Sequence, residues 1–159
     1  VDMAAAPGAL EHLRRLLAED PRRVLQVEPE KALHIACGTG SLEAARLVLD
    51  RGIDINIIYD DDGCTPLLCA CAYGHADVAA LLLARGADTG AVSPDGSTAL
   101  ILAASCQDWP GSDHVAVIRL LIEDGRVPIN ARDSEGCSAL AHACVHGHTE
   151  RALSLIHIS

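Results

Sequence analysis

Apolar residues recur along this chain at helical spacing, in short stretches that end at glycines. Ala70 and Cys71 lie three and four positions after Leu67, which places all three side chains on one face of a helix. Thr65 precedes them, and a threonine hydroxyl can cap the start of a helix. Gly74 follows them, and glycine readily takes the left-handed conformation that ends a helix. A second apolar stripe then runs to the next glycine, so the pattern predicts two short helices joined by a turn.

This two-helix unit recurs along the chain with a period near 33 residues. Its anchoring leucines are Leu33, Leu67, Leu100 and Leu140, so the successive intervals are 34, 33 and 40 residues. The longest interval contains a six-residue insertion within residues 105–113. The predicted helices are shorter than the ~12–15 residues at which an isolated helix becomes marginally stable. Each unit must therefore be stabilised by its neighbours, as in a solenoid.

The second unit resembles the ankyrin repeat, whose period and core motif it shares. The matching residues are Thr65, Pro66, Leu67, Ala70, Gly74, His75, Leu81, Leu82, Gly86, Ala87 and Asp88. The resemblance covers roughly residues 10–152 and implies an all-α-dominated solenoid of stacked helix-turn-helix repeats with short hairpin loops. It also implies that the His75 ring bonds to the backbone of a neighbouring loop.

The same register predicts the boundaries of the units. The predicted units are a partial N-terminal or capping repeat (1–28), three full repeats (29–61, 62–94 and 95–134, the last with the insertion) and a truncated repeat (135–153). Residues 154–159 are interpreted as a non-native tail, and the chain as a fragment of a longer ankyrin-repeat protein. Lys31 and Ala32 replace the usual Thr-Pro pair, so the inner helix of the first full repeat should have a weaker N-terminal cap. The truncated repeat is expected to expose the side on which a further unit would stack.

Charge and cysteine content narrow the classes of function. The chain has 12 Lys and Arg against 22 Asp and Glu, a formal charge of −10. This acidic balance disfavours binding to nucleic acid and to anionic membranes, both of which require clustered cations. The seven cysteines are an odd number in a chain long enough to form its own core, and no leader segment is recognisable. We therefore expect reduced thiols and a cytoplasmic or nuclear location.

Histidine and cysteine are frequent enough to raise the question of metal binding. His142 and His146 share a face of a predicted helix, but Cys144 points to a different side. The sequence has no Cys-x-x-Cys pair, and the resemblance assigns most cysteines to buried positions. It also has no glycine-rich phosphate loop and no recognisable nucleophile–base set. We expect no metal, no cofactor and no enzymatic activity.

The resemblance implies a binding surface made of two parts. Inner-helix positions not used for stacking should line a hollow face: Ile35, Thr39, Cys69, Ala72, Tyr73, Leu102, Ser105, His142 and His146. The hairpin tips should add Tyr59, Asp60, Asp61, Asp62, Asp95 and Asp133. Trp109 in the insertion is a further candidate because tryptophan is enriched at interface hot spots. Two alternatives stay open, namely that Trp109 packs against its own loop and that the acidic tips only confer solubility.

These observations predict a protein–protein interaction module, a scaffold or adaptor that performs no chemistry. Its partner would carry a basic, partly apolar segment, because the predicted surface is acidic and mildly apolar. The alternative is that these repeats are the regulatory or targeting arm of a larger enzyme or of a ubiquitin-ligase adaptor. Only sequence outside this chain would distinguish the two.

Overall fold

The computed structural model describes residues 15, 18–26, 28–59, 63–108 and 111–157. Its elements, in chain order, are the short 3-10 helix η1 (Pro21–Gln26) and the α-helices α2 (Pro29–Thr39), α3 (Leu42–Leu49), α4 (Pro66–Ala72), α5 (Ala76–Ala84), α6 (Ala99–Ser105), α7 (His114–Asp124), α8 (Ala139–Val145) and α9 (Thr149–Ile156). Among these residues no helix is long and apolar enough to cross a membrane.

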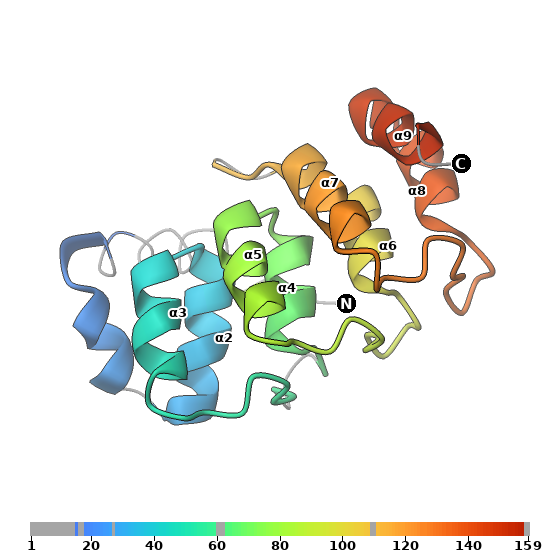
Figure 1. The fold of residues 1–159 in the computed structure, drawn as a ribbon. Coiled ribbons are helices and arrows are strands. Elements are labelled where there is room, and N and C mark those ends of the chain that lie inside the picture. Colours follow the sequence, from blue (N-terminus) through green and yellow to red (C-terminus); the bar gives the residue numbers. More distant parts are fainter. Residues whose placement is uncertain (1–14, 16–17, 27, 60–62, 109–110, 158–159) are drawn as a thin grey trace.

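The α-helices form antiparallel pairs that stack side by side in one row (Figure 1). Helices α2, α4, α6 and α8 make the inner layer, and α3, α5, α7 and α9 make the outer layer. Each α-helix contacts its partner and at least one neighbouring helix of its own layer. The predicted all-α solenoid of stacked helix pairs is confirmed.

Side-chain caps begin three of the inner helices. The hydroxyl oxygens of Thr65, Thr98 and Ser138 each accept a hydrogen bond, at 3.3 Å, from the backbone N–H three residues ahead. The cap predicted at Thr65 is thus confirmed. Helix α2 begins differently, because Pro29 occupies its first turn and the preceding Glu28 makes no side-chain cap bond. The first unit therefore lacks the cap of the others, as Lys31 and Ala32 suggested.

The hydrophobic core is thin and runs the length of the stack. The anchoring side chains Leu33, Leu67 and Leu100 are between 0% and 2% exposed. Leu140, at the equivalent position of α8, is 37% exposed, and Leu153 of α9 is 50% exposed. Among the described helices α8 and α9 have a neighbouring pair on one side only, which explains this difference. The fourth unit therefore exposes the side on which a further unit would stack, as the sequence predicted.

Loops with tight turns lead from the outer helices into α6 and α8. In each, a single antiparallel bridge closes the loop, between Val92 and Thr98 and between Arg132 and Ser138. The two loops also touch, because the Ser134 N–H donates a 3.0 Å hydrogen bond to the carbonyl of Asp95. The predicted hairpin loops are confirmed at these two places.

Gly74 allows neighbouring units to approach closely where α4 ends. It has a φ of 73°, and a Cβ atom there would lie 2.8 Å from the Ser112 side chain and 2.9 Å from the His114 ring. At the junction between the α2–α3 pair and the α4–α5 pair, the Nε2 atom of His75 hydrogen-bonds the carbonyl of Gly38 at 3.0 Å. This is the backbone-bonding role that the resemblance implied for His75.

The unit boundaries expected from the sequence stay predictions. Helix α9 continues to Ile156 and buries Leu155 to 5% exposure, so it crosses the expected start of a tail after residue 153. Residues 158 and 159, and most of the expected N-terminal repeat, lie outside the described residues.

Candidate protein-binding surface

Much of the predicted hollow face is closed. The exposed fractions are 3% for Thr39, 0% for Cys69, 3% for Ala72, 8% for Tyr73 and 6% for Leu102. The expectation that these five side chains form an open strip is therefore wrong.

The reason is the close approach of inner-layer residues. The Cys69 Sγ atom lies 3.9 Å from the carbonyl oxygen of His34 in the preceding unit, which leaves no room for solvent. The Thr39 hydroxyl turns back onto its own helix and donates to the carbonyl of Ile35 at 2.7 Å. Small side chains such as alanine and cysteine permit this spacing, and burying them contributes to the core rather than to a surface.

The other predicted residues retain some exposure or fall outside the description. Ile35, Tyr59, Ser105, Asp133 and His142 are partly buried, whereas Asp95 and His146 are exposed. Asp60, Asp61, Asp62 and Trp109 lie outside the described residues.

Tyr59 and Asp95 are held in place by their neighbours. The Tyr59 ring stacks on the ring of His34, with centroids 4.6 Å apart. The Asp95 carboxylate accepts hydrogen bonds from the Ser93 hydroxyl and from the Ser97 N–H. Partial burial alone would raise the pKa of Asp95, but these hydrogen bonds outweigh it and lower the pKa. Asp95 therefore presents a fixed negative charge on its loop.

The second half of α8 and the residue after it carry a group that we call the α8 patch, made of partly buried His142 and exposed Val145 and His146. Val145 is 79% exposed. The rings of His142 and His146 stack with centroids 6.0 Å apart and planes 4° apart. An apolar side chain beside stacked imidazoles on a packed helix is a surface that a partner can desolvate.

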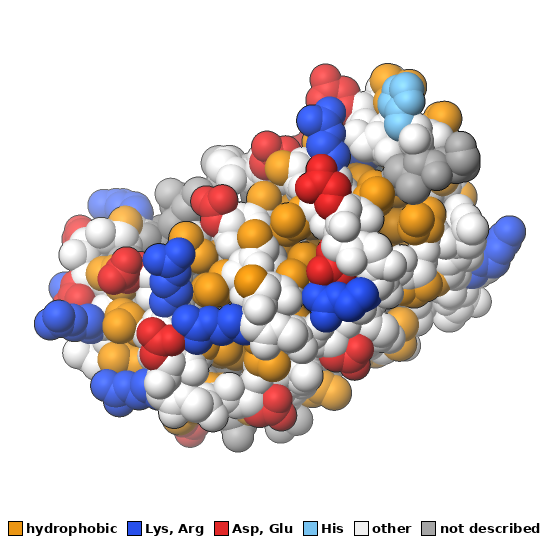
Figure 2. Space-filling view, in the orientation of Figure 1, with side chains coloured by type: hydrophobic (Ala, Val, Ile, Leu, Met, Phe, Trp, Pro, Cys, Tyr) orange, Lys and Arg blue, Asp and Glu red, His pale blue; other side chains and the backbone are white. Residues whose placement is uncertain are grey.

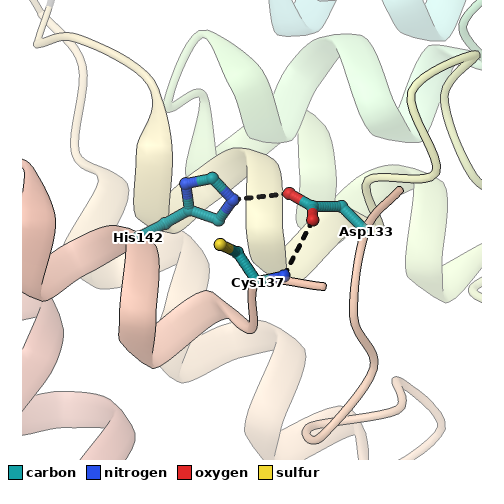
Figure 3. A group of neighbouring side chains, drawn as sticks. All are labelled: Asp133, Cys137 and His142. Atoms are coloured by element: carbon teal, nitrogen blue, oxygen red, sulfur yellow. Dashed lines mark hydrogen bonds and ion pairs between the residues drawn. The ribbon is translucent and has the colours of Figure 1, made fainter. Parts of the chain in front are cut away.

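His142 also meets two residues of the loop that precedes its helix. Its Nε2 hydrogen-bonds the Asp133 carboxylate at 2.6 Å, and Cys137 lies beside them (Figure 3). This hydrogen bond, followed by one from the Cys137 N–H, lowers the pKa of Asp133. Among the described residues this is the one group of His, Cys and acidic side chains close enough to hold a metal ion. Sequence reasoning considered His142 with His146 and Cys144 instead, because it looked for ligands along a single helix.

A nucleophilic cysteine needs a base that faces its sulfur. In Figure 3 the Nε2 atom of His142 faces Asp133, and its Nδ1 atom points away from Cys137. The three residues therefore do not form a nucleophile–base–carboxylate relay.

A buried network that sequence reasoning missed holds the insertion. His114 of α7 is 2% exposed, and its Nε2–H donates to the carbonyl of Ala72 at 2.9 Å. Burial lowers the pKa of His114, so the ring is neutral near pH 7. Its Nδ1 atom then accepts from the Arg151 guanidinium, 3.1 Å away. One ring thus links the units that contain α4, α7 and α9.

Arg151 completes this network from α9. It is 3% exposed, donates to the carbonyl of Cys106 at 2.6 Å, and forms an ion pair with Asp108. Partial burial would raise the pKa of Asp108, but the charge of Arg151 outweighs it and lowers the pKa. The sequence signal was present, because Arg151 lies in the same apolar phase of α9 as Ala152 and Leu155. A charged residue in an apolar stripe indicates a buried partner.

The outer layer offers a shallow groove of about 360 Å³ between α5 and α7. It is lined by apolar side chains, among them Ala76, Ala80 and Leu120, and by charged ones such as Arg119 and Glu123. Figure 2 shows hydrophobic side chains interspersed with charged ones across this view, without one large apolar patch.

A family model described as ankyrin repeats, in three copies, matches residues 2–93 and 81–159. The chain belongs to the ankyrin-repeat family. The resemblance drawn from the second unit is confirmed, and the match extends over nearly the whole chain. A comparison with curated proteins finds no significant match. Ankyrin repeats generally act as modules that bind other proteins, and their stacked units create an extended surface for this purpose.

Proposed function

We propose that this ankyrin-repeat chain binds a partner protein through the exposed part of its inner-helix face and its hairpin tips, and that it performs no chemistry itself. The observation that carries the proposal is Val145, an apolar side chain 79% exposed on a helix whose other side is packed. His146, next to it in sequence, and Asp95, on the loop that leads into α6, are exposed polar and charged side chains that could contribute further contacts.

The scaffold that presents these residues is pre-organised. Hydrogen bonds cross the unit junctions, from the Asp88 N–H to the Asn56 side-chain oxygen at 2.9 Å and from the Ser134 N–H to the Asp95 carbonyl at 3.0 Å. A surface that is already ordered loses little conformational entropy on association. This favours recognition of a partner over any function that requires the chain to rearrange.

The charge of the chain indicates the chemistry of the partner. The formal net charge is −10, and Asp95 and Asp133 both have lowered pKa values, so they are ionised at neutral pH. A partner segment that combines basic and apolar side chains would match the carboxylates and the α8 patch together. The predicted cytoplasmic or nuclear location is part of this proposal.

The test is quantitative recovery of proteins on the immobilised chain, comparing wild type with Val145→Asp. The matched control is Leu153→Asp, which places the same charge at an apolar side chain 50% exposed on the outer helix of the same pair. We expect Val145→Asp to reduce recovery of the specific partner by about 30-fold, as for a hot-spot residue, and Leu153→Asp to leave it unchanged. Equal recovery by all three proteins would contradict the proposed surface.

Two further arms test the finer parts of the proposal. Raising the salt concentration should weaken capture by slowing encounter, because complementary charges act mainly on the association rate. Trp109→Ala should also reduce recovery if the insertion contributes the contact predicted from the sequence. Capture that does not respond to salt would argue against a basic partner segment.

A further inference from the structure

Asp133, Cys137 and His142 bring a carboxylate, a thiol and an imidazole to one point at the start of the fourth described helix pair. One ligand atom from each residue lies within 4.8 Å of the other two, and all three residues are partly buried. Figure 3 shows the three side chains converging from the loop and from α8. Oxygen, sulfur and nitrogen donors in this combination are the ligands that zinc-class ions bind in proteins.

Asp133 is oriented for this role by its own loop. Its Oδ1 atom accepts hydrogen bonds from the backbone N–H groups of Glu135, at 3.0 Å, and Cys137, at 2.9 Å. Its Oδ2 atom is thereby directed at the Nε2 atom of His142. Outer hydrogen bonds that fix a carboxylate in this way are a regular part of metal sites.

The ankyrin fold does not require these donors. The equivalent positions of the preceding unit are Ser93, Ser97 and Leu102. There the Ser93 hydroxyl accepts the Ser97 N–H at 3.2 Å, which is the turn-closing bond that Asp133 makes to Cys137. A serine therefore suffices for the turn, and an apolar leucine suffices on the helix. The thiol, the imidazole and the second carboxylate oxygen are surplus to the needs of the fold.

We propose that Asp133, Cys137 and His142 bind a divalent ion of the zinc class, with a fourth coordination position open to water. The ion replaces the hydrogen bond between His142 and Asp133. Nε2 of His142 gives up the proton that it donates to Asp133, and the ring binds the ion as the neutral tautomer with its proton on Nδ1. The thiol proton of Cys137 is released to solvent as the thiolate binds the ion. The 2.6 Å separation between Nε2 and Oδ2 must widen by less than about 1 Å for tetrahedral coordination. Side chains that are 19% and 6% exposed leave a path for the ion and allow this adjustment. The site shares Asp133 and His142 with the proposed binding surface, but its test involves no partner protein, so either proposal can fail without the other.

The test is titration of the intact, tag-free, reduced and chelator-treated chain with Co²⁺, followed by Zn²⁺. We expect uptake of about one ion per chain, a near-ultraviolet thiolate-to-cobalt charge-transfer band, and strong visible absorption typical of four-coordinate cobalt, all lost on addition of Zn²⁺. Cys137→Ser should abolish the charge-transfer band. His142→Leu should weaken Co²⁺ binding by more than about 10-fold.

These two variants introduce the residue types that the preceding unit carries at the same positions, so the fold should tolerate them. Circular dichroism checks this, and if one variant fails to fold the other carries the test. The control is Cys144→Ser, which removes the exposed thiol of α8 and should leave the cobalt spectrum unchanged. The proposal is overturned if the wild-type chain shows no charge-transfer band, or if Cys137→Ser retains it.

Discussion

The guanidinium of Arg151 forms an ion pair with the carboxylate of Asp108, which ties α9 to the loop inserted before α7. The two ends of the pair differ in environment, because the Arg151 side chain is 3% exposed and that of Asp108 is 70% exposed. Most of the cost of removing charge from water therefore falls on Arg151. Backbone carbonyls of Ala104 and Cys106 accept its other donors and offset that cost. His114 bonds the backbone of the preceding unit as His75 does. Arg151 adds its own contacts at this junction, where the insertion interrupts the repeat.

Replacing this arginine should destabilise the stack. Arg151→Met retains the apolar stem but leaves the carbonyls of Ala104 and Cys106 without their donor. We expect the free energy of unfolding to fall by about 2 kcal/mol, measured by urea denaturation followed by circular dichroism. Arg119→Met, at an exposed position of α7, should change it by less than about 0.5 kcal/mol. Similar small losses for both variants would show that the network adds no stability.

Stability should decrease as the pH falls through 6.5. Burial lowers the pKa of His114 below its ordinary value of 6.5, and Arg151 acts in the same direction, although Asp108 opposes it. The unfolded chain therefore binds a proton that the folded chain does not, and stability is lost as pH falls from the unfolded pKa to the folded pKa. At pH values above this range, the titration of His114 no longer changes the free energy of unfolding.

Matched variants test whether His114 causes this dependence of stability on pH. His114→Gln should flatten the dependence of the urea midpoint on pH between 7 and 5, whereas His157→Gln, at an exposed position after α9, should have little effect on it. Burial also lowers the pKa of His148, so part of the slope should remain in His114→Gln. An identical pH profile for wild type and His114→Gln would refute the assignment.

Two glycines with the same backbone conformation should respond differently to alanine. Gly74 and Gly125 have φ values of 73° and 74°, but a Cβ atom at Gly125 meets nothing within 4 Å, whereas at Gly74 it meets Ser112 and His114. Gly125→Ala should cost about 1 kcal/mol from the left-handed conformation alone. Gly74→Ala should cost about 1–3 kcal/mol more, because the neighbouring unit must shift. Equal losses in urea denaturation would mean that the junction is not tightly packed.

The cysteines should react with thiol reagents in an order set by burial. Cys144 is exposed, whereas Cys37 and Cys71 are 0% exposed and burial raises their pKa values above the ordinary range. Because the thiolate is the reactive form, both should react only after unfolding. Labelling of the native chain followed by peptide mass analysis should find Cys144 modified first, and Cys144→Ser should lack the fast phase. Early modification of Cys37 would contradict the described core.

The local features of the fold were predictable from neighbouring residues. Thr65 identified a capped helix start and Gly74 its end, because capping and left-handed turns depend on a few consecutive residues. The spacing of Leu33, Leu67 and Leu100 identified the stacked repeat, since short helices with one apolar face must cover each other.

The binding surface was less predictable. Position in the repeat placed Cys69 and Leu102 on a hollow face, but their exposure depends on how closely adjacent inner helices approach, which is a property of pairs of units. The sequence placed Asp133 at a hairpin tip and His142 on a helix face, and it did not single out Cys137. These residues belong to a loop, a helix and the turn between them, and only the folded chain brings their side chains together.

The sequence by itself therefore determined the repeating helix pairs and the fact that they stack. Helix starts and ends depend on a few consecutive residues, and short helices with one regular apolar face need a neighbouring unit to cover it. Only the tertiary structure decided which side chains are exposed, that Arg151 is buried against Asp108, and that a thiol meets an imidazole beside a carboxylate. Burial and the convergence of polar groups depend on distances between residues from different units or elements, and those distances are set only when the stack is assembled.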